Sequence, residues 1–255
     1  MISLTQLKNQ SELIKDRDWQ TLIILDACRF DTFASVIKDH AITGDLIEVD
    51  SSVCKTSGWY KHNWRGRHDD VVLVTGHPMV WRNDRHKTFH FAINILGSAT
   101  DWCVPSRTLE KAVEAQEKYP DKKIMAHLIP PHLPFMGEQG KLLHDDIIQM
   151  SKKKPVTSTA GGTLYQAATK YGLKFGWDKL IACYRENLEY ALAEILLYID
   201  KLKDPIIITA DHGELLGNNK KKGPTYGHKG GHDVLRRVPW FAVKRKADDK
   251  NLAKD

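Results

Sequence analysis

Short, continuous apolar runs are the feature that most constrains how this chain folds. Five of them recur along the sequence: TLIILD (21–26), DVVLVTG (70–76), KKIMAHLI (122–129), PIIITAD (205–211) and PWFAVK (239–244). They do not alternate apolar and polar residues, so we expect strands that are covered on both faces. Segments of helical periodicity lie between them, at 4–16, 106–119 and 177–202. This pattern predicts an α/β fold, with a mostly parallel central sheet and helices on both faces.

The chain length of 255 residues predicts one domain over residues 1–255, because it is enough to bury the core of one large α/β domain. One segment departs from the alternation of strands and helices. Residues 136–176 include SKKKPVTSTAGGT and show no clear periodicity. Long irregular segments inside compact domains are usually functional loops or disordered. We therefore predict an irregular insertion at about 136–176.

The composition is that of an ordinary globular protein, with 42% hydrophobic and 27% charged residues. The N-terminus holds no signal-peptide core, and no run of about 18 apolar residues occurs anywhere. These absences predict a cytoplasmic protein with no membrane contact. The four cysteines form no CxxC pair, which argues against a disulfide framework and a thiolate zinc site; they are Cys28, Cys54, Cys103 and Cys183.

The net charge of +6 is concentrated in three basic clusters, at 151–155, 218–223 and 243–246. Such clusters are either solvated loops or a surface that attracts an anionic substrate. They contain no interleaved aromatic residues, so they do not specify nucleic acid, which is kept as an alternative partner.

Acidic and histidine residues collect where the predicted strands end. The first run ends at Asp26, the third carries His127 and is followed by His132, and the fourth ends in Asp211 and His212. Ligands of open α/β sheets bind beyond the carboxyl ends of the strands, so these residues are expected to converge. Carboxylates and imidazoles suit zinc, manganese and similar divalent ions.

A nucleophile is expected in the segment VDSSVCKTSGWYKHNW (49–64), ahead of a predicted helix. A hydroxyl or thiol at a helix N-terminus and bound to a metal ionises more easily and attacks as an anion. The candidates are Ser51, Ser52, Cys54, Thr56 and Ser57.

Four segments resemble, in the same order, motifs of sulfatase-like members of the alkaline phosphatase superfamily: LIILDACRFDTF, AHLIPPHLPF, ITADHGELLG and YGHKGGHDVLRRVPWFAV. The chain is similar in particular to short, mostly prokaryotic sulfatase-like hydrolases of unassigned substrate. The resemblance implies a largely parallel sheet and one or two divalent ions, with Zn or Mn ahead of Mg or Ca. It also implies in-line attack by a Ser, a Thr or a formylglycine on a phosphorus or sulfur ester.

The resemblance also implies metal ligands. Asp26, Asp211 and His212 match the ligands of the ion that activates the nucleophile. His132 matches a histidine that contacts the transferred group or a second metal, and His127 is expected to join it.

Further roles follow from the same resemblance. His228 stands where the family places a histidine or lysine facing the same anion, and we group Lys229 with it as substrate-binding. Thr56 matches the nucleophile, because Trp59 follows it three residues later. Glu214 is expected to orient a ligand.

One motif points to a different reaction. CVPSR (103–107) matches the Cys-x-Pro-Ser-Arg signature in which sulfatases form formylglycine. However, Cys103 lies 77 residues after Asp26 and lacks the Leu-x-Thr-Gly continuation. Pro105 and Ser106 are also typical of a helix start, so we expect this motif to be structural.

The sequence therefore predicts a metal-dependent hydrolase of phosphate mono- or diesters that works through Thr56 and a covalent phospho-enzyme. The substrate is expected to be an anionic small-molecule or nucleotide-type ester. Three alternatives are kept: a sulfatase, a phosphoglycerol- or phosphoethanolamine-type transferase, and a non-catalytic member that binds a metal or an anion.

Overall fold

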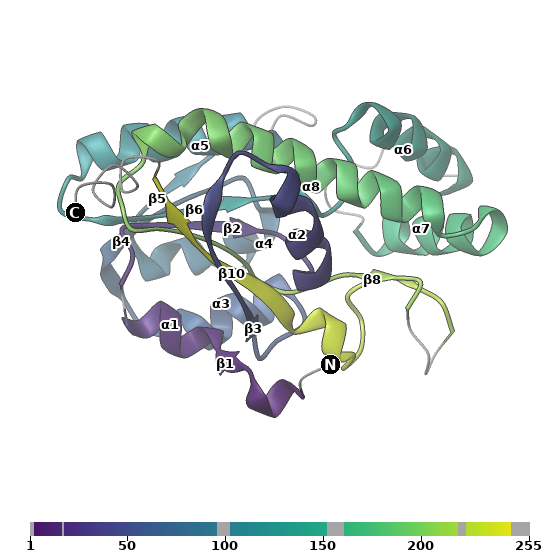
Figure 1. The fold of residues 1–255 in the computed structure, drawn as a ribbon, viewed down its shortest axis with the longest axis horizontal. Coiled ribbons are helices and arrows are strands. Elements are labelled where there is room, and N and C mark those ends of the chain that lie inside the picture. Colours follow the sequence, from purple (N-terminus) through teal and green to yellow (C-terminus); the bar gives the residue numbers. More distant parts are fainter. Residues whose placement is uncertain (1–2, 17, 96–102, 152–160, 219–222, 246–255) are drawn as a thin grey trace, which may run out of the picture.

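A computed structural model describes residues 3–16, 18–95, 103–151, 161–218 and 223–245 of the chain. Its centre is an eight-stranded sheet with strand order β1-β3-β10-β7-β2-β6-β4-β5 (Figure 1). The strands are β1 Lys8–Asn9, β2 Thr21–Leu25, β3 Thr43–Asp50, β4 His68–Thr75, β5 Phe89–Asn94, β6 Lys123–Leu128, β7 Ile206–Ala210 and β10 Arg237–Lys244. A separate hairpin pairs β8 Leu215–Leu216 with β9 Tyr226–Gly227.

Strand β10 is antiparallel to both of its neighbours, β3 and β7, and the other pairs in the sheet are parallel. The predicted fold class, a mostly parallel sheet between helices, is confirmed. All five predicted strands are present. In this sheet, sequence reasoning missed β3, whose residues alternate in burial instead of forming a continuous apolar run, and the two edge strands β1 and β5.

Helices cover both faces of this sheet. In Figure 1, α5 and α8 lie above the sheet and α1 and α3 lie below it. The α-helices are α1 Gln10–Asp16, α2 Phe30–Val36, α3 Thr56–Asn63, α4 Pro78–Arg82, α5 Pro105–Lys118, α6 Glu138–Ser151, α7 Gly161–Phe175 and α8 Asp178–Tyr198. Short 3-10 helices are η1 Leu4–Gln6, η2 Ile37–Asp39, η3 Arg85–Thr88, η5 Ile199–Lys201 and η6 Asp233–Leu235.

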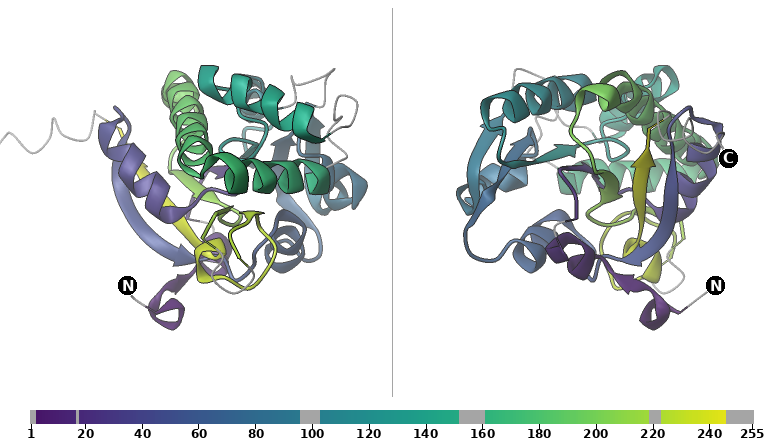
Figure 2. Two further views of the ribbon diagram at one scale, coloured as in Figure 1. Left: turned by 90° about the vertical axis from the view of Figure 1, so that its right-hand side faces the viewer. Right: turned by 60° about the vertical axis from the view of Figure 1, so that its left-hand side comes forward.

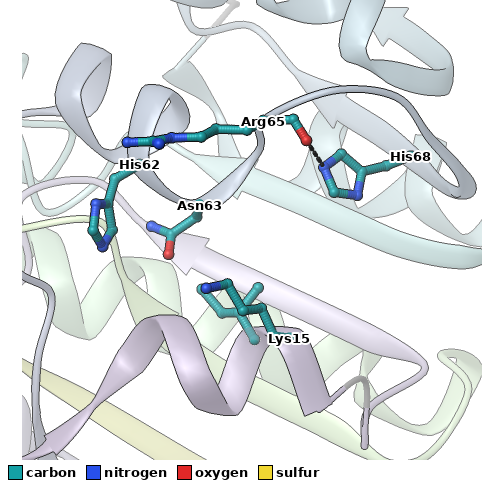
Figure 3. Close-up of a pocket in the computed structure, with 6 residues that line it drawn as sticks. Lys15, His62, Asn63, Arg65 and His68 are labelled. Atoms are coloured by element: carbon teal, nitrogen blue, oxygen red, sulfur yellow. Dashed lines mark hydrogen bonds between the residues drawn. The ribbon is translucent and has the colours of Figure 1, made fainter.

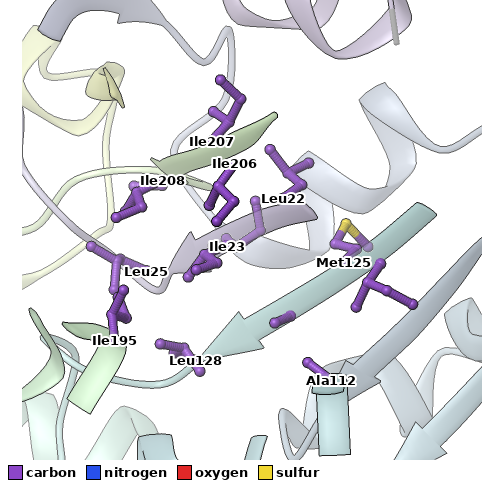
Figure 4. Packing of buried hydrophobic residues seen from close by; sticks show 14 of the residues in the cluster. Leu22, Ile23, Leu25, Ala112, Met125, Leu128, Ile195, Ile206, Ile207 and Ile208 are labelled. Carbon is purple, nitrogen blue, oxygen red and sulfur yellow. The ribbon is translucent and has the colours of Figure 1, made fainter. Parts of the chain in front are cut away.

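The core explains why the central strands are apolar without interruption. All five residues of β2 and all five of β7 are buried. Figure 4 shows Leu22, Ile23 and Leu25 among side chains of β6 and β7, with Ala112 of α5 and Ile195 of α8 also in the cluster. Each such fully buried aliphatic side chain contributes roughly 1.5–3 kcal/mol relative to exposure. A polar residue on either face of β2 would forfeit that contribution.

The prediction that residues 136–176 are irregular is wrong over two stretches. Helices α6 and α7 occupy Glu138–Ser151 and Gly161–Phe175 and pack against each other and near α8 (Figures 1 and 2). They bury Leu143, Ile147 and Ala168 in a second small core. The apolar pattern is weak because this pair covers its own small core and not the sheet. The predicted helix at 4–16 is an α-helix only over Gln10–Asp16.

Candidate metal centre

The strand register brings the two acidic candidates together. Leu25 of β2 pairs with Ala210 of β7 and with Leu128 of β6. The residues that follow Leu25 and Ala210 are Asp26 and Asp211, so the two carboxylates lie next to each other at one edge of the sheet. Both are buried, with 1% and 0% of their surface exposed.

Each of the two carboxylates has one oxygen bound by the protein and one that is free. Asp26 Oδ2 lies 3.0 Å from His77 Nε2, and Asp211 Oδ1 accepts from the backbone N–H groups of Ala27 (3.0 Å) and His212 (2.9 Å). Asp26 Oδ1 and Asp211 Oδ2 are buried without a hydrogen-bond partner. Buried acceptors of this kind normally have a partner, so this pair of oxygens is suited to bind a cation.

His212 supplies the third group of this centre. Its Nδ1 donates to the carbonyl of Gly213 (2.8 Å), which can only accept, so Nε2 carries the lone pair. Nε2 lies 3.6 Å from Asp26 Oδ1, 3.4 Å from Asp211 Oδ2 and 3.3 Å from Thr56 Oγ1. Burial lowers the pKa of His212 well below its usual value, which keeps the ring neutral and able to bind a metal.

These separations fit a divalent cation. Ligand atoms placed tetrahedrally at 2.0–2.1 Å from zinc are about 3.3 Å apart, which matches the distances from His212 Nε2. Burial, with the charge of Asp26 added, raises the pKa of Asp211 well above its usual range. Two adjacent buried carboxylates repel each other unless a cation lies between them.

Thr56 is positioned by Trp59, three residues further along the same helix. It is the first residue of α3, and Trp59 on the same helix is fully buried. The Trp59 indole N–H donates to Gln10 Oε1 (2.8 Å), and Gln10 Nε2 donates to Thr209 Oγ1 and to the carbonyl of Ala210. Helix α3 is thereby tied to the end of β7, one residue before Asp211. The Thr-x-x-Trp spacing thus has a structural reason.

The other candidate nucleophiles have different contacts. The Ser51 hydroxyl donates to the carbonyl of Val53 and the Ser52 hydroxyl accepts from Asn9, while Ser57 is half-buried. Burial raises the pKa of the Cys54 thiol, which disfavours a thiolate. Cys103 is buried just before α5, and its thiol contacts Met136 Sδ.

His127 lies deeper than the other candidates, inside β6. A ring nitrogen of His127 and oxygens of Asp26 and Asp211 lie within 4.8 Å of one another. Its Nδ1 hydrogen-bonds the Tyr60 hydroxyl (2.9 Å), whereas its Nε2 is buried without a partner. Burial lowers its pKa to about 3, so the ring is neutral. The structure places His127 beside the carboxylate pair, whereas His132 lies in the second group described next.

A second group of ligand atoms lies beside the first. Leu215 pairs with Gly227 in the β8-β9 hairpin, which makes Glu214 and His228 neighbours. His228 Nδ1 lies 3.5 Å from Glu214 Oε1, and atoms of His132, Glu214 and His228 lie within 4.8 Å of one another. The rings of His212 and His228 have centroids 4.5 Å apart, which joins the two groups.

Glu214 offers a ligand atom to this second group, whereas the sequence predicted only that it orients a ligand. It is fully buried, and neither carboxylate oxygen has a hydrogen-bond partner. Burial alone would lower the pKa of His228, but the nearby charge of Glu214 contributes to raising it. His132 donates from Nδ1 to the carbonyl of Leu133, and its Nε2 contacts the hydroxyl of Tyr165.

A cavity of about 300 Å³ lies elsewhere, at the opposite end of α3 from Thr56 (Figure 3). It is lined by Ile14, Lys15, His62, Asn63, Arg65 and His68. Arg65 donates to the carbonyl of Lys61, and the His68 ring hydrogen-bonds the carbonyl of Arg65. These basic groups bind backbone carbonyls near the C-terminus of α3, where positive charge is favoured.

No family model matches this chain, and no curated protein does. Solved structures do match. The C-terminal periplasmic domain of the phosphoethanolamine transferase EptC from Campylobacter jejuni is 14% identical with a TM-score of 0.53, over 98% of this chain and 86% of that one. The corresponding domain of EcEptC from Escherichia coli, in complex with Zn, is 12% identical with a TM-score of 0.50, over 100% and 80%. A protein in the alkaline phosphatase superfamily from Vibrio parahaemolyticus is 9% identical with a TM-score of 0.50, over 88% and 59%.

This chain has the alkaline phosphatase superfamily fold. At these identities the likeness concerns the fold alone. It agrees with the fold that the resemblance of the sequence motifs implies. Within this superfamily fold, the residues around Asp26 and Asp211 lie at the edge where the central parallel strands end, as is usual for open α/β sheets.

The predicted cytoplasmic location is contradicted by these matches, because the two EptC structures are C-terminal periplasmic domains. That prediction depended on the lack of a signal peptide and of an apolar run. In the described part of the chain, no helix combines the length and apolar character needed to cross a membrane.

Other predicted residues lie away from the two groups or beyond the described residues. Lys229 is exposed next to His228. Parts of all three basic clusters lie outside the described residues: 219–222 of the 218–223 cluster, most of the 151–155 cluster and the end of the 243–246 cluster. Sequence reasoning assigned no role to Tyr60, His77 or Tyr165. Tyr60 directly follows Trp59 and His77 directly follows the predicted strand at 70–76, whereas Tyr165 carries no local sequence signal.

Proposed function

We propose that this protein cleaves phosphate mono- or diesters in a metal-dependent reaction with Thr56 as the nucleophile. The single observation that carries the proposal is the position of Thr56 Oγ1, which lies 3.3 Å from His212 Nε2. The neighbouring carboxylates of Asp26 and Asp211 each have one oxygen without a hydrogen-bond partner. A hydroxyl that completes a buried ligand set is typical of a nucleophile activated by a cation.

The chain offers a distinct ligand set for the ion. Asp26, Asp211, His212 and Thr56 would hold one divalent cation, with Zn or Mn suited to this mixture of carboxylate and imidazole. A bound cation lowers the pKa of a coordinated hydroxyl and neutralises charge on phosphoryl oxygens. A fold neighbour was solved in complex with Zn, which supports divalent metal binding here.

The residues of the chain then carry the reaction in two steps. The Thr56 hydroxyl loses its proton and Oγ forms a bond to phosphorus, while the phosphorus–oxygen bond to the leaving group breaks on the opposite side. The departing oxygen takes up a proton and leaves as the alcohol, which gives a phosphothreonine. Water next attacks phosphorus, releases phosphate or its monoester and restores the Thr56 hydroxyl. His132 and His228 face the phosphoryl group, and with Glu214 they form the site where a second ion would bind. The anionic substrate is also attracted by Lys229 beside them.

The test is a panel of nitrophenyl phosphate, bis-nitrophenyl phosphate and nitrophenyl sulfate, assayed with added Zn or Mn. We expect turnover of phosphate esters that is lost in Thr56→Ala and Asp26→Asn, together with a mass increase for phosphothreonine in trapped protein. Turnover of the sulfate alone, with loss of activity in Cys103→Ala, would replace this proposal by a sulfatase.

A second candidate is transfer of a phosphoryl group to an alcohol instead of water. It is favoured by the fold neighbours that are phosphoethanolamine transferases. The covalent step through Thr56 is the same, and only the acceptor differs. Adding glycerol or ethanolamine to the diester assay separates the two, because a transferase yields the new ester in excess of free phosphate.

A further inference from the structure

We propose that His77 is a positioning residue that holds the carboxylate of Asp26 so that Oδ1 faces the cation. The inference deepens the proposed function, since it rests on the metal site of Asp26, Asp211 and His212. His77 lies in a different part of the chain from these ligands. It immediately precedes α4, of which it is the N-cap.

The hydrogen bonds of His77 determine which ring nitrogen carries the proton. Nδ1 accepts the backbone N–H of Met79 at 3.1 Å, so Nδ1 must be the unprotonated nitrogen. Nε2 therefore carries the hydrogen in the neutral ring and donates to Asp26 Oδ2 at 3.0 Å.

This donation leaves the other oxygen of Asp26 available. Oδ1 has no hydrogen-bond partner and lies 3.6 Å from His212 Nε2. A carboxylate with one oxygen held cannot rotate freely, so its free oxygen stays directed at the ligand set. Groups that hydrogen-bond a metal ligand in this way orient it and strengthen binding.

A histidine at this cap position can make two contacts that the usual capping residues cannot make together. Caps are usually Ser, Thr, Asp or Asn, whose short side chains accept one helix N–H. Those side chains could accept from Met79 but are too short to reach Asp26 as well. His77 is also held in place: its backbone N–H donates to Thr75 Oγ1 (3.0 Å), and its ring stacks on His127 with centroids 5.3 Å apart.

The chain contains a matched control for this arrangement. His232 is the N-cap of η6, and its Nδ1 accepts the backbone N–H of Val234 at 3.3 Å. Among the described residues, no carboxylate pairs with His232. It therefore shares the capping role of His77 and lacks the contact with a metal ligand.

The test measures zinc affinity by titrating the metal-free protein against a chromophoric chelator. His77→Asn keeps an acceptor for the Met79 N–H but cannot reach Asp26. We expect His77→Asn to bind zinc about 10–100-fold more weakly than wild type. We expect His232→Asn to bind like wild type, and thermal unfolding of the metal-free variants should show that both caps are retained.

Wild-type zinc affinity in His77→Asn, together with loss of binding in Asp26→Asn, would overturn the inference and leave the proposed function untouched. If zinc binds and weakens as expected but no phosphate ester is cleaved, the proposed function fails while the positioning role of His77 is supported.

Discussion

Asp26 and Asp211 each lie one residue beyond a registered pair, Leu25 and Ala210, on neighbouring parallel strands. The register alone therefore sets two buried carboxylates side by side. His77 holds one of them, and the backbone of Ala27 and His212 holds the other. The remaining oxygens lie 3.4–3.6 Å from one unprotonated imidazole nitrogen. A cluster of acceptors with this geometry is suited to bind a cation.

Metal binding should stabilise the protein. A ligand at 100 times its dissociation constant adds about 2.7 kcal/mol to the free energy of unfolding. For a chain of this size that corresponds to a rise in Tm of roughly 5–10 °C. Thermal unfolding with zinc and with a chelator measures the shift. The Asp26→Asn variant serves as the control, and an equal shift in that variant would place the ion elsewhere.

Asp211→Asn should stabilise the metal-free protein at pH 7 while it removes metal binding. Burial and the charge of Asp26 raise the pKa of Asp211 above its unfolded value. Folding is therefore weakened progressively as pH rises from about 4 through the folded pKa. The amide keeps an oxygen for the N–H groups of Ala27 and His212 but carries no charge.

We expect a gain of roughly 1–2 kcal/mol in the free energy of unfolding of Asp211→Asn, measured by urea denaturation without metal. The gain should shrink at pH 4, where the folded carboxyl is protonated and the unfolded carboxyl is about half protonated. A loss of stability at pH 7 would show that the buried carboxylate pair is compensated by protein groups alone.

Thr56→Ala should abolish turnover with little effect on folding. Removing a nucleophile lowers kcat by roughly 10³-fold or more, whereas the lost methyl and hydroxyl lie at the first position of α3. Thr56→Ser keeps the hydroxyl and should retain measurable activity. The kinetic assay with a nitrophenyl ester checks both variants, and an active Thr56→Ala protein would return the role to another hydroxyl or thiol of residues 51–57 or to Cys103.

The buried His127 should make the metal-free protein acid-sensitive. Its pKa is lowered to about 3 by burial, below the unfolded value. Stability from the neutral ring is therefore complete above about pH 6.5 and is lost as pH falls toward 3. One such group contributes a slope of up to about 1.4 kcal/mol per pH unit.

The double variant His127→Phe with Tyr60→Phe tests this contribution, because it keeps the aromatic stack and leaves neither polar atom unpaired. We expect a smaller slope of its unfolding free energy against pH between 6 and 4. The difference from wild type should correspond to at most one fewer proton taken up on unfolding. An unchanged slope in urea unfolding would assign the acid sensitivity to other groups such as His212.

The local sequence was sufficient to predict the fold class and to show which acidic and histidine residues lie at the strand ends. Strands β2, β6 and β7 are covered on both faces, so their continuous apolar runs could be recognised without tertiary information. Asp26, His127, Asp211 and His212 lie in or directly after these runs, which made their convergence predictable.

The tertiary structure decided everything that depends on contacts between distant segments. It formed helices α6 and α7 where no periodicity was evident, because their apolar residues face a small separate core. It placed Thr56 beside His212, on a helix that the Trp59–Gln10 hydrogen bond ties to β7. It also brought His77 to Asp26 and Tyr165 to His132. Hydrogen bonds between residues about 30 to 50 positions apart have no local sequence pattern, so only the packed fold could reveal them.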